Sequence, residues 1–140
     1  MYLLRPARGI NIELMIDQEE IDTLLAASAL DRVEYCIEQI VEEDVLWVIG
    51  TESGFTMFTE GEQAVFPVWP YAEYAQLLCN EGEKPESIEL ERFLQHYLPN
   101  FKEQGYKIAI MPLPTGKGVV ASTHDFAEYI KVAQEAADDY

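Results

Sequence analysis

Hydrophobic and polar residues follow two different periods along this chain, one helical and one extended. Between residues 17 and 41, apolar side chains recur every three or four positions, which is typical of an amphipathic helix. Asp17 followed by Glu20, and Asp31 followed by Glu34, resemble helix starts in which side-chain oxygens accept unpaired backbone N–H groups. This segment is therefore predicted to form two short helices or one bent helix.

The pattern changes at Val45 to short runs of β-branched and aromatic residues. Three such runs, 45–50, 54–60 and 63–69, are separated by short turns that contain glycine. This arrangement predicts a three-stranded antiparallel meander. Pro67 has no backbone N–H, so we expect the third strand to lie at a sheet edge or to carry a bulge.

The segment after the meander predicts two helices and a loop between them. Residues 70–79 predict a short helix, and the polar stretch 80–87 predicts a mobile loop. Apolar residues from 90 to 98 follow a helical period, and Pro99 is expected to end that helix.

The C-terminal part predicts a second hairpin and a closing helix. Strands at 106–113 and 118–122 are expected to pair, and Ser122 with Asp125 marks the next helix start. Strands joined by hairpins rather than by long crossovers favour antiparallel pairing. We therefore predict an α+β fold, with an antiparallel sheet of about five strands (a three-stranded meander plus a hairpin) and helices packed on it.

The domain organisation is predicted to be simple. No linker, repeat or low-complexity tract divides the sequence, which favours a single α+β domain over residues 17–140. Residues 1–16 lack a clear period and are expected to be a loosely ordered N-terminal arm. Met15 is an alternative start of the chain, because regular structure is predicted just after it.

Charge is the most distinctive bulk property. Twenty-six Asp and Glu against nine Lys and Arg give a net charge of −17. Such a surface repels phosphates and anionic lipids, so we expect no direct nucleic-acid or membrane partner. The negative charge favours a basic protein as the partner. The alternative is that it only keeps the protein soluble.

The cellular location is predicted to be cytoplasmic. No apolar run approaches the ~20 residues of a membrane span, and the N-terminus has no signal-peptide pattern. Cys36 and Cys79 are expected to be buried, unpaired thiols, because neither belongs to a C-x-x-C pair and both fall in helical segments.

Four local patterns occur in order along the chain: Arg-x-Glu-Tyr at 32–35 leading into Trp47, WPYAEYA at 69–75, ERFLQHYLP at 91–99 and MPLPTGKGVVAS at 111–122. Together they resemble the bacterial domain of unknown function 2750 family over about residues 31–138. The resemblance implies a compact bacterial α+β domain. Because the family has no established activity, it transfers no catalytic residue.

Motifs of enzyme sites are absent or incomplete in the sequence. The loop 112–119 fails the phosphate-binding P-loop pattern, because Met111 and Gly118 occupy the positions that require Gly and Ser or Thr. A hairpin turn is predicted there instead. His96 and His124 have no second metal ligand at helical spacing. His96 is therefore predicted to be a partly exposed helix residue, and His124 to be part of a helix entry.

The clustered carboxylates also argue against catalysis. The acidic residues between 81 and 91 are expected in one solvated loop, whereas acid–base catalysis needs two carboxylates in different environments. We therefore predict no enzyme, no catalytic residue, no cofactor and no metal.

The remaining candidate is an aromatic corner between a strand and a helix. Core packing is predicted for most of the aromatic residues; Trp69, Tyr71 and Tyr74 are the candidates to rim a pocket or a protein contact, since Trp and Tyr are favoured interface anchors. The predicted function is an acidic cytoplasmic binding or regulatory module that acts through a protein partner. An immunity- or inhibitor-like version requires acids clustered on one face. The alternative is a small-molecule-binding domain or weak enzyme that uses the Trp69–Tyr74 corner with the Thr115–Lys117 loop.

Overall fold

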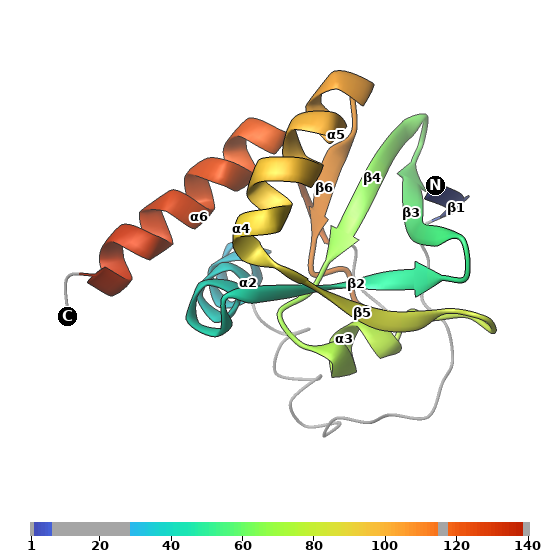
Figure 1. The fold of residues 1–140 in the computed structure, drawn as a ribbon, viewed down its shortest axis with the longest axis horizontal. Coiled ribbons are helices and arrows are strands. Elements are labelled where there is room, and N and C mark those ends of the chain that lie inside the picture. The colour runs from blue at the N-terminus through green and yellow to red at the C-terminus, as the bar shows by residue number, and fades with distance from the viewer. Residues whose placement is uncertain (1, 7–28, 115–117, 139–140) are drawn as a thin grey trace.

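The computed structural model describes residues 2–6, 29–114 and 118–138. This part is α+β, with one mixed sheet and helices packed against it (Figure 1). The strands are β1 (Tyr2–Pro6), β2 (Val45–Thr51), β3 (Gly54–Glu60), β4 (Gln63–Val68), β5 (Lys84–Glu89), β6 (Lys107–Ile110) and β7 (Val119–Ala121). The helices are α2 (Ala29–Glu43), α3 (Ala72–Gln76), α4 (Leu90–Arg92), η1 (Phe93–Tyr97, a π-helix), α5 (Leu98–Gln104) and α6 (Thr123–Asp138).

The sheet order is β5-β2-β3-β4-β6-β7, with β1 beside β3. The predicted meander of β2, β3 and β4 and the predicted hairpin of β6 and β7 are both confirmed. Two pairs are parallel, β4 with β6 and β1 with β3, so the sheet is mixed rather than purely antiparallel. The β4–β6 pair is parallel because a long crossover, which contains α3, β5 and the helix of α4, η1 and α5, lies between these strands in the chain.

The predicted mobile loop at 80–87 is wrong in its second half, which is part of strand β5. β5 pairs with β2 over six positions, from Val45 opposite Glu89 to Gly50 opposite Lys84. Of its residues only Ile88 is buried, because β5 is the edge strand of the sheet. Edge strands tolerate charged residues and proline, so a polar composition concealed this strand.

The predicted edge position of the third strand is also wrong, because β4 lies between β3 and β6. The β3–β4 ladder ends at Val65. The backbone N–H of Trp69 points away from β6 and donates to the backbone carbonyl of Trp47 at 2.9 Å. The backbone N–H of Trp47 donates in return to the carbonyl of Trp69 at 2.8 Å. Alternation along the strand places the Pro67 nitrogen on that same side, where no ladder bond of β3 continues. The missing donor is tolerated because β4 has already left β3.

Pro99 does not end the helix predicted from 90 to 98. The chain stays helical through α4, η1 and α5 to Gln104. In a regular α-helix the Pro99 ring would clash with the carbonyl four residues before it. The π-turn just before the proline widens the helix, with the Leu98 N–H bonded to the carbonyl of Phe93, and accommodates Pro99.

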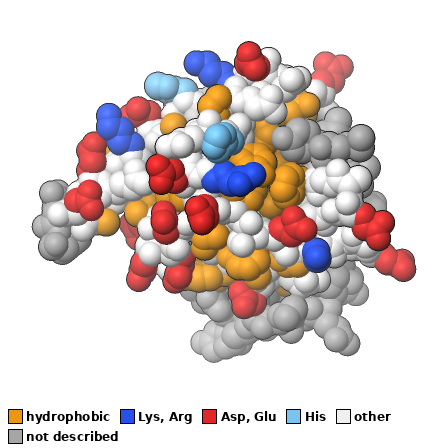
Figure 2. Space-filling view, in the orientation of Figure 1, with side chains coloured by type: hydrophobic (Ala, Val, Ile, Leu, Met, Phe, Trp, Pro, Cys, Tyr) orange, Lys and Arg blue, Asp and Glu red, His pale blue; other side chains and the backbone are white. Residues whose placement is uncertain are grey.

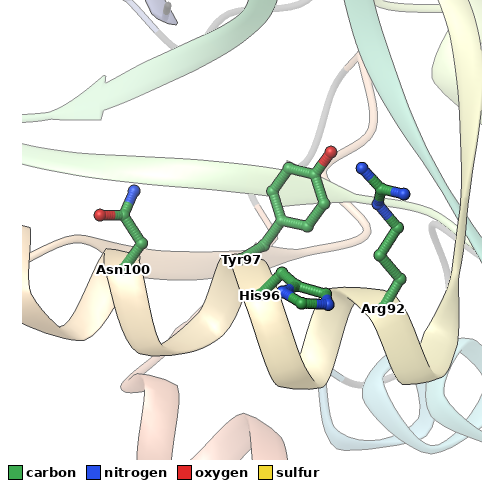
Figure 3. A pocket seen from close by; sticks show the side chains of 4 residues that line it. All are labelled: Arg92, His96, Tyr97 and Asn100. Carbon is green, nitrogen blue, oxygen red and sulfur yellow. The ribbon is translucent and has the colours of Figure 1, made fainter.

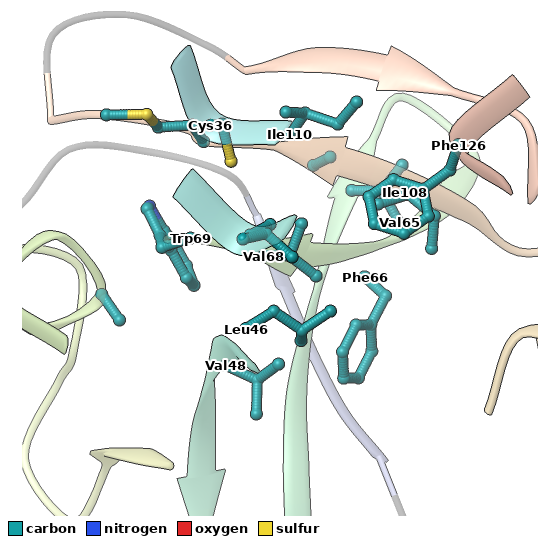
Figure 4. Packing of buried hydrophobic residues seen from close by; sticks show 14 of the residues in the cluster. Cys36, Leu46, Val48, Val65, Phe66, Val68, Trp69, Ile108, Ile110 and Phe126 are labelled. Atoms are coloured by element: carbon teal, nitrogen blue, oxygen red, sulfur yellow. The ribbon is translucent and has the colours of Figure 1, made fainter. Parts of the chain in front are cut away.

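A continuous apolar core lies between the sheet and its helices (Figure 4). Trp69, Phe66 and Phe126 are among the largest buried side chains. Cys36 and Cys79 are both buried and form no disulfide with each other, as predicted. No helix among the described residues is long and apolar enough to cross a membrane.

The two ends of the predicted domain have different outcomes. Residues 2–6 of the predicted arm form β1 and pair with β3, whereas 7–16, with Met15, and the predicted helix at 17–28 lie outside the described residues. The predicted start of the closing helix is confirmed, since the Asp125 N–H donates to the Ser122 side-chain oxygen at 3.0 Å.

Candidate functional site

The aromatic corner predicted as a binding surface is mostly core. Trp69 and Tyr74 are 0% and 2% exposed, so they present no surface to a partner in this structure. The Trp69 indole N–H donates to the carbonyl of Pro112 at 2.7 Å. The Tyr74 ring meets the edge of Tyr35 with centroids 6.3 Å apart. The reason is tertiary: Pro112, in the connection after β6, and Tyr35, in α2, are far from the corner in the chain and pack against it only in the folded protein.

Of the other residues predicted for that surface, only Tyr71 lies in the described part of the chain. Tyr71 is half-buried, and its hydroxyl donates to the side-chain oxygen of Gln39 at 2.6 Å. Thr115 and Lys117 lie outside the described residues. Of the chain around that loop, the structure brings Pro112 to the corner, through the buried hydrogen bond to Trp69.

A surface hollow lies elsewhere, on the helix formed by α4, η1 and α5 (Figure 3). We call it the π-helix hollow; it has a volume of about 460 Å³ and is lined by Arg92, His96, Tyr97 and Asn100. His96 is exposed on a helix, as predicted, and the other three were not predicted.

The π-helix decides which side chains share the hollow. In a regular α-helix, residues five apart point about 140° away from each other. A π-turn bonds each N–H to the carbonyl five residues earlier, so residues i and i+5 lie one above the other. Arg92 and Tyr97 are five apart, and in Figure 3 the guanidinium and the phenol hydroxyl extend to the same side of the helix.

The electrostatics of the π-helix hollow contrast with those of the chain as a whole. None of the lining side chains is a carboxylate, although the chain has 26 Asp and Glu. Within the described residues, no hydrogen bond or ion pair engages the side chains of Arg92, His96 or Asn100. The nearest acid in sequence, Glu91, accepts a hydrogen bond from Gln95 at 3.0 Å.

The neighbourhood of the hollow is partly apolar. The half-buried Tyr97 ring stacks on Phe93 with centroids 6.0 Å apart, and it lies edge-to-face with half-buried Phe55 at 5.9 Å. Figure 2 shows a histidine and a basic side chain together near the centre of this face, beside hydrophobic side chains. Acidic side chains are spread around them over the face in view.

The chemistry available in the π-helix hollow is that of hydrogen-bond donors. A guanidinium, a phenol and an amide NH₂ all donate, and an imidazole donates from at least one nitrogen. This set suits an oxyanion, because guanidinium matches carboxylate and phosphate geometry. No group of three or more metal-ligating side chains occurs in the described part of the chain.

One sequence signal marks three of these residues. Arg92, His96 and Asn100 recur every four positions, so they lie on one helical face. Tyr97 was out of reach of this argument, because its place beside Arg92 depends on the π-turn.

Comparison with known proteins bears on the family of the chain. No curated protein and no solved structure matches it. A family model described as a protein of unknown function (DUF2750) matches residues 33–130, which is more than half of the 140 residues and includes the whole π-helix hollow. The chain therefore belongs to the DUF2750 family.

Proposed function

We propose that this chain is a non-catalytic binding module of the cytoplasm, which acts through a protein partner and holds an anionic group of that partner in the π-helix hollow. The observation that carries the proposal is a set of four donor side chains with no carboxylate among them, in a chain of net charge −17. Two buried cysteines that form no disulfide with each other support a reducing compartment.

The exposure of the lining favours a partner over a free small molecule. Small-molecule sites bury most of the ligand surface and are largely apolar. Here Arg92, His96 and Asn100 are all exposed, so the hollow encloses a ligand poorly. A group carried by a larger partner gains additional contacts around the rim.

The distribution of acidic side chains distinguishes a role in solubility from a role in partner binding. They are spread over the face seen in Figure 2 rather than gathered in one patch, which favours solubility over the immunity- or inhibitor-like version on that face. The spread charge also disfavours polyanions, since its field extends about 8 Å at physiological salt.

Anion titration followed by amide NMR tests the binding site. Sodium acetate is titrated at constant ionic strength, with sodium chloride as the reference, into the full chain and the variant Arg92→Gln. We expect amide shifts confined to the 92–100 helix, a Kd on the order of millimolar, and a loss of these shifts in Arg92→Gln. Lys102→Gln is the matched control, because Lys102 is exposed on the same helix but does not line the hollow. Equal shifts in both variants would contradict the proposal.

A comparative capture experiment tests the protein partner. The full chain, Arg92→Gln and Lys102→Gln are used as baits under identical salt conditions. The proposal expects a partner retained by the full chain and by Lys102→Gln but lost with Arg92→Gln. A partner retained equally by all three baits binds elsewhere and counts against the π-helix hollow.

A further inference from the structure

We infer that the group held in the π-helix hollow is a single carboxylate attached to an apolar, preferably aromatic, moiety. This inference rests on the proposed function and specifies its ligand. A carboxylate attached to an apolar moiety occurs both in the C-terminal residue of a protein and in a free apolar acid. The experiment below distinguishes these two sources.

The carboxylate follows from the donors. A guanidinium fork offers two parallel N–H donors to a planar oxyanion. Arg92 supplies that fork, and the Tyr97 hydroxyl lies on the same side of the helix (Figure 3). His96 and Asn100 also line the hollow, so a second oxygen of the ligand also finds a donor.

The single charge follows from the surroundings. Glu89 and Glu91 precede Arg92 in the chain and are exposed, and the net charge is −17. A dianion such as a phosphate monoester therefore experiences about twice the long-range repulsion of a monoanion. The local cation compensates one negative charge more completely than two.

The apolar moiety follows from the aromatic rings beside the donors. Tyr97 is half-buried between Phe93, at 6.0 Å, and Phe55, at 5.9 Å, and Phe55 is itself half-buried. An apolar group next to the bound carboxylate rests on these ring edges and removes their remaining exposed area from water. Acetate has no such group and misses this contribution.

The test is a set of NMR titrations of the full chain at constant ionic strength. The probes are acetate, 3-phenylpropanoate, its uncharged amide, phenyl phosphate and N-acetylphenylalanine. We expect 3-phenylpropanoate or N-acetylphenylalanine to bind at least fivefold more tightly than acetate, roughly the effect of one small apolar contact. The amide is expected to bind at least tenfold more weakly than the acid, and phenyl phosphate no more tightly than the acid.

Variants of the hollow separate charge from geometry. Arg92→Lys keeps the positive charge but loses the guanidinium fork. We expect this variant to bind 3-phenylpropanoate and N-acetylphenylalanine severalfold more weakly than the full chain does. Tyr97→Phe keeps the ring and loses the hydroxyl. The affinities for both aromatic acids should therefore fall by a similar factor, and the ratio of the two affinities should stay unchanged. Amide spectra and unfolding midpoints establish that each variant is folded.

Each outcome has a definite meaning. Tighter binding of N-acetylphenylalanine than of 3-phenylpropanoate identifies a protein C-terminus as the source, and the reverse order identifies a free apolar acid. Equal binding of the amide and the acid, or tighter binding of phenyl phosphate, overturns the inference. If acetate binds at Arg92 but the aromatic acids bind no better, only this inference fails; if no anion binds there, the proposed function fails as well.

Discussion

Individual polar groups inside this chain are satisfied by specific, long-range partners. Thr56 is 1% exposed, and its hydroxyl donates to Glu83 at 2.5 Å. The other carboxylate oxygen of Glu83 accepts the N–H of Asn80 at 2.6 Å. Glu83 therefore has a structural role, although the acidic composition of its segment predicts only a solvated surface. A buried hydroxyl needs such a partner because its desolvation is otherwise uncompensated.

Replacing Trp69 by Phe tests the bond that covers the aromatic corner. The variant keeps most of the apolar area but leaves the buried carbonyl of Pro112 without its donor at 2.7 Å. We expect the free energy of unfolding to fall by about 1–3 kcal/mol, measured by urea denaturation with circular dichroism. Trp47→Phe is the control, since Trp47 is half-buried and no side-chain hydrogen bond of it is described. Equal losses in the two variants would refute this role of the bond.

Cys36 makes stability depend on alkaline pH. Burial raises the pKa of the Cys36 thiol well above its ordinary value of 9.0. The thiol therefore stays neutral in the folded chain while it ionises in the unfolded chain above about pH 9, so its contribution is complete below that pH and declines above it. We expect the free energy of unfolding to fall by up to about 1.4 kcal/mol per pH unit there.

The matched variant for this prediction is Cys36→Ala. It costs stability at neutral pH by leaving a small cavity, but it removes the ionisable group. Urea denaturation from pH 8 to 10.5 is compared between the two chains, so that the other groups that titrate in this range cancel. Identical pH slopes would show that Cys36 does not contribute.

At the scale of secondary structure, the helix from Leu90 to Gln104 shows how local exceptions shape a site. Its π-turn accommodates Pro99 and brings Tyr97 next to Arg92. It ends at Gly105, whose φ of 77° lies in the left-handed region. Insertions of this kind in a helix are frequent at functional sites.

Gly105→Ala tests this helix end. The N–H of Tyr106 donates to the carbonyl of Phe101 at 2.9 Å across the glycine, which is typical of a glycine-terminated helix. An added Cβ meets no atom within 4 Å, so the cost is backbone strain alone. We expect a loss of about 1 kcal/mol in the free energy of unfolding. Gly105→Asn should lose less, because asparagine tolerates this conformation; a larger loss for Asn would contradict the argument.

At the scale of the whole molecule, the sheet joins segments that are far apart in the chain. β1, near the N-terminus, pairs in parallel with β3 from Tyr2 opposite Phe55 to Pro6 opposite Thr59. In Figure 1 the N-terminus lies beside β3, at the opposite side of the molecule from the C-terminal end of α6. Residues 2–6 are therefore part of the sheet rather than a detached arm.

Removal of residues 1–6 tests this pairing. The shortened chain loses the strand beside β3, so amides of residues 55–59 should exchange with deuterium faster and the urea midpoint should fall. Amides of the β6–β7 hairpin provide the internal control, because they pair only with β4 and with each other in the sheet. Unchanged exchange at 55–59 would argue against the β1–β3 pairing.

Much of the fold could be predicted because its signals are local. The meander, the β6–β7 hairpin and the Ser122 cap each depend on residues a few positions apart. β5 escaped prediction because an edge strand has no need of an apolar alternation. Of the candidate binding residues, Trp69 and Tyr74 were recognised as aromatic anchors, but their burial depends on chain segments that meet them only after folding.

The sequence by itself determined the α+β class, the strand and helix order of most of the chain, the burial of both cysteines and the acidic balance. These properties follow from composition, periodicity and turn chemistry. Only the tertiary structure decided the parallel β4–β6 pair, the addition of β5 and β1, and the grouping of Arg92 with Tyr97. Backbone pairing between distant segments is a cooperative result of packing, and no local pattern of residues encodes it. The π-turn alters the helical period on which a sequence argument relies, so the period alone does not place Tyr97 beside Arg92.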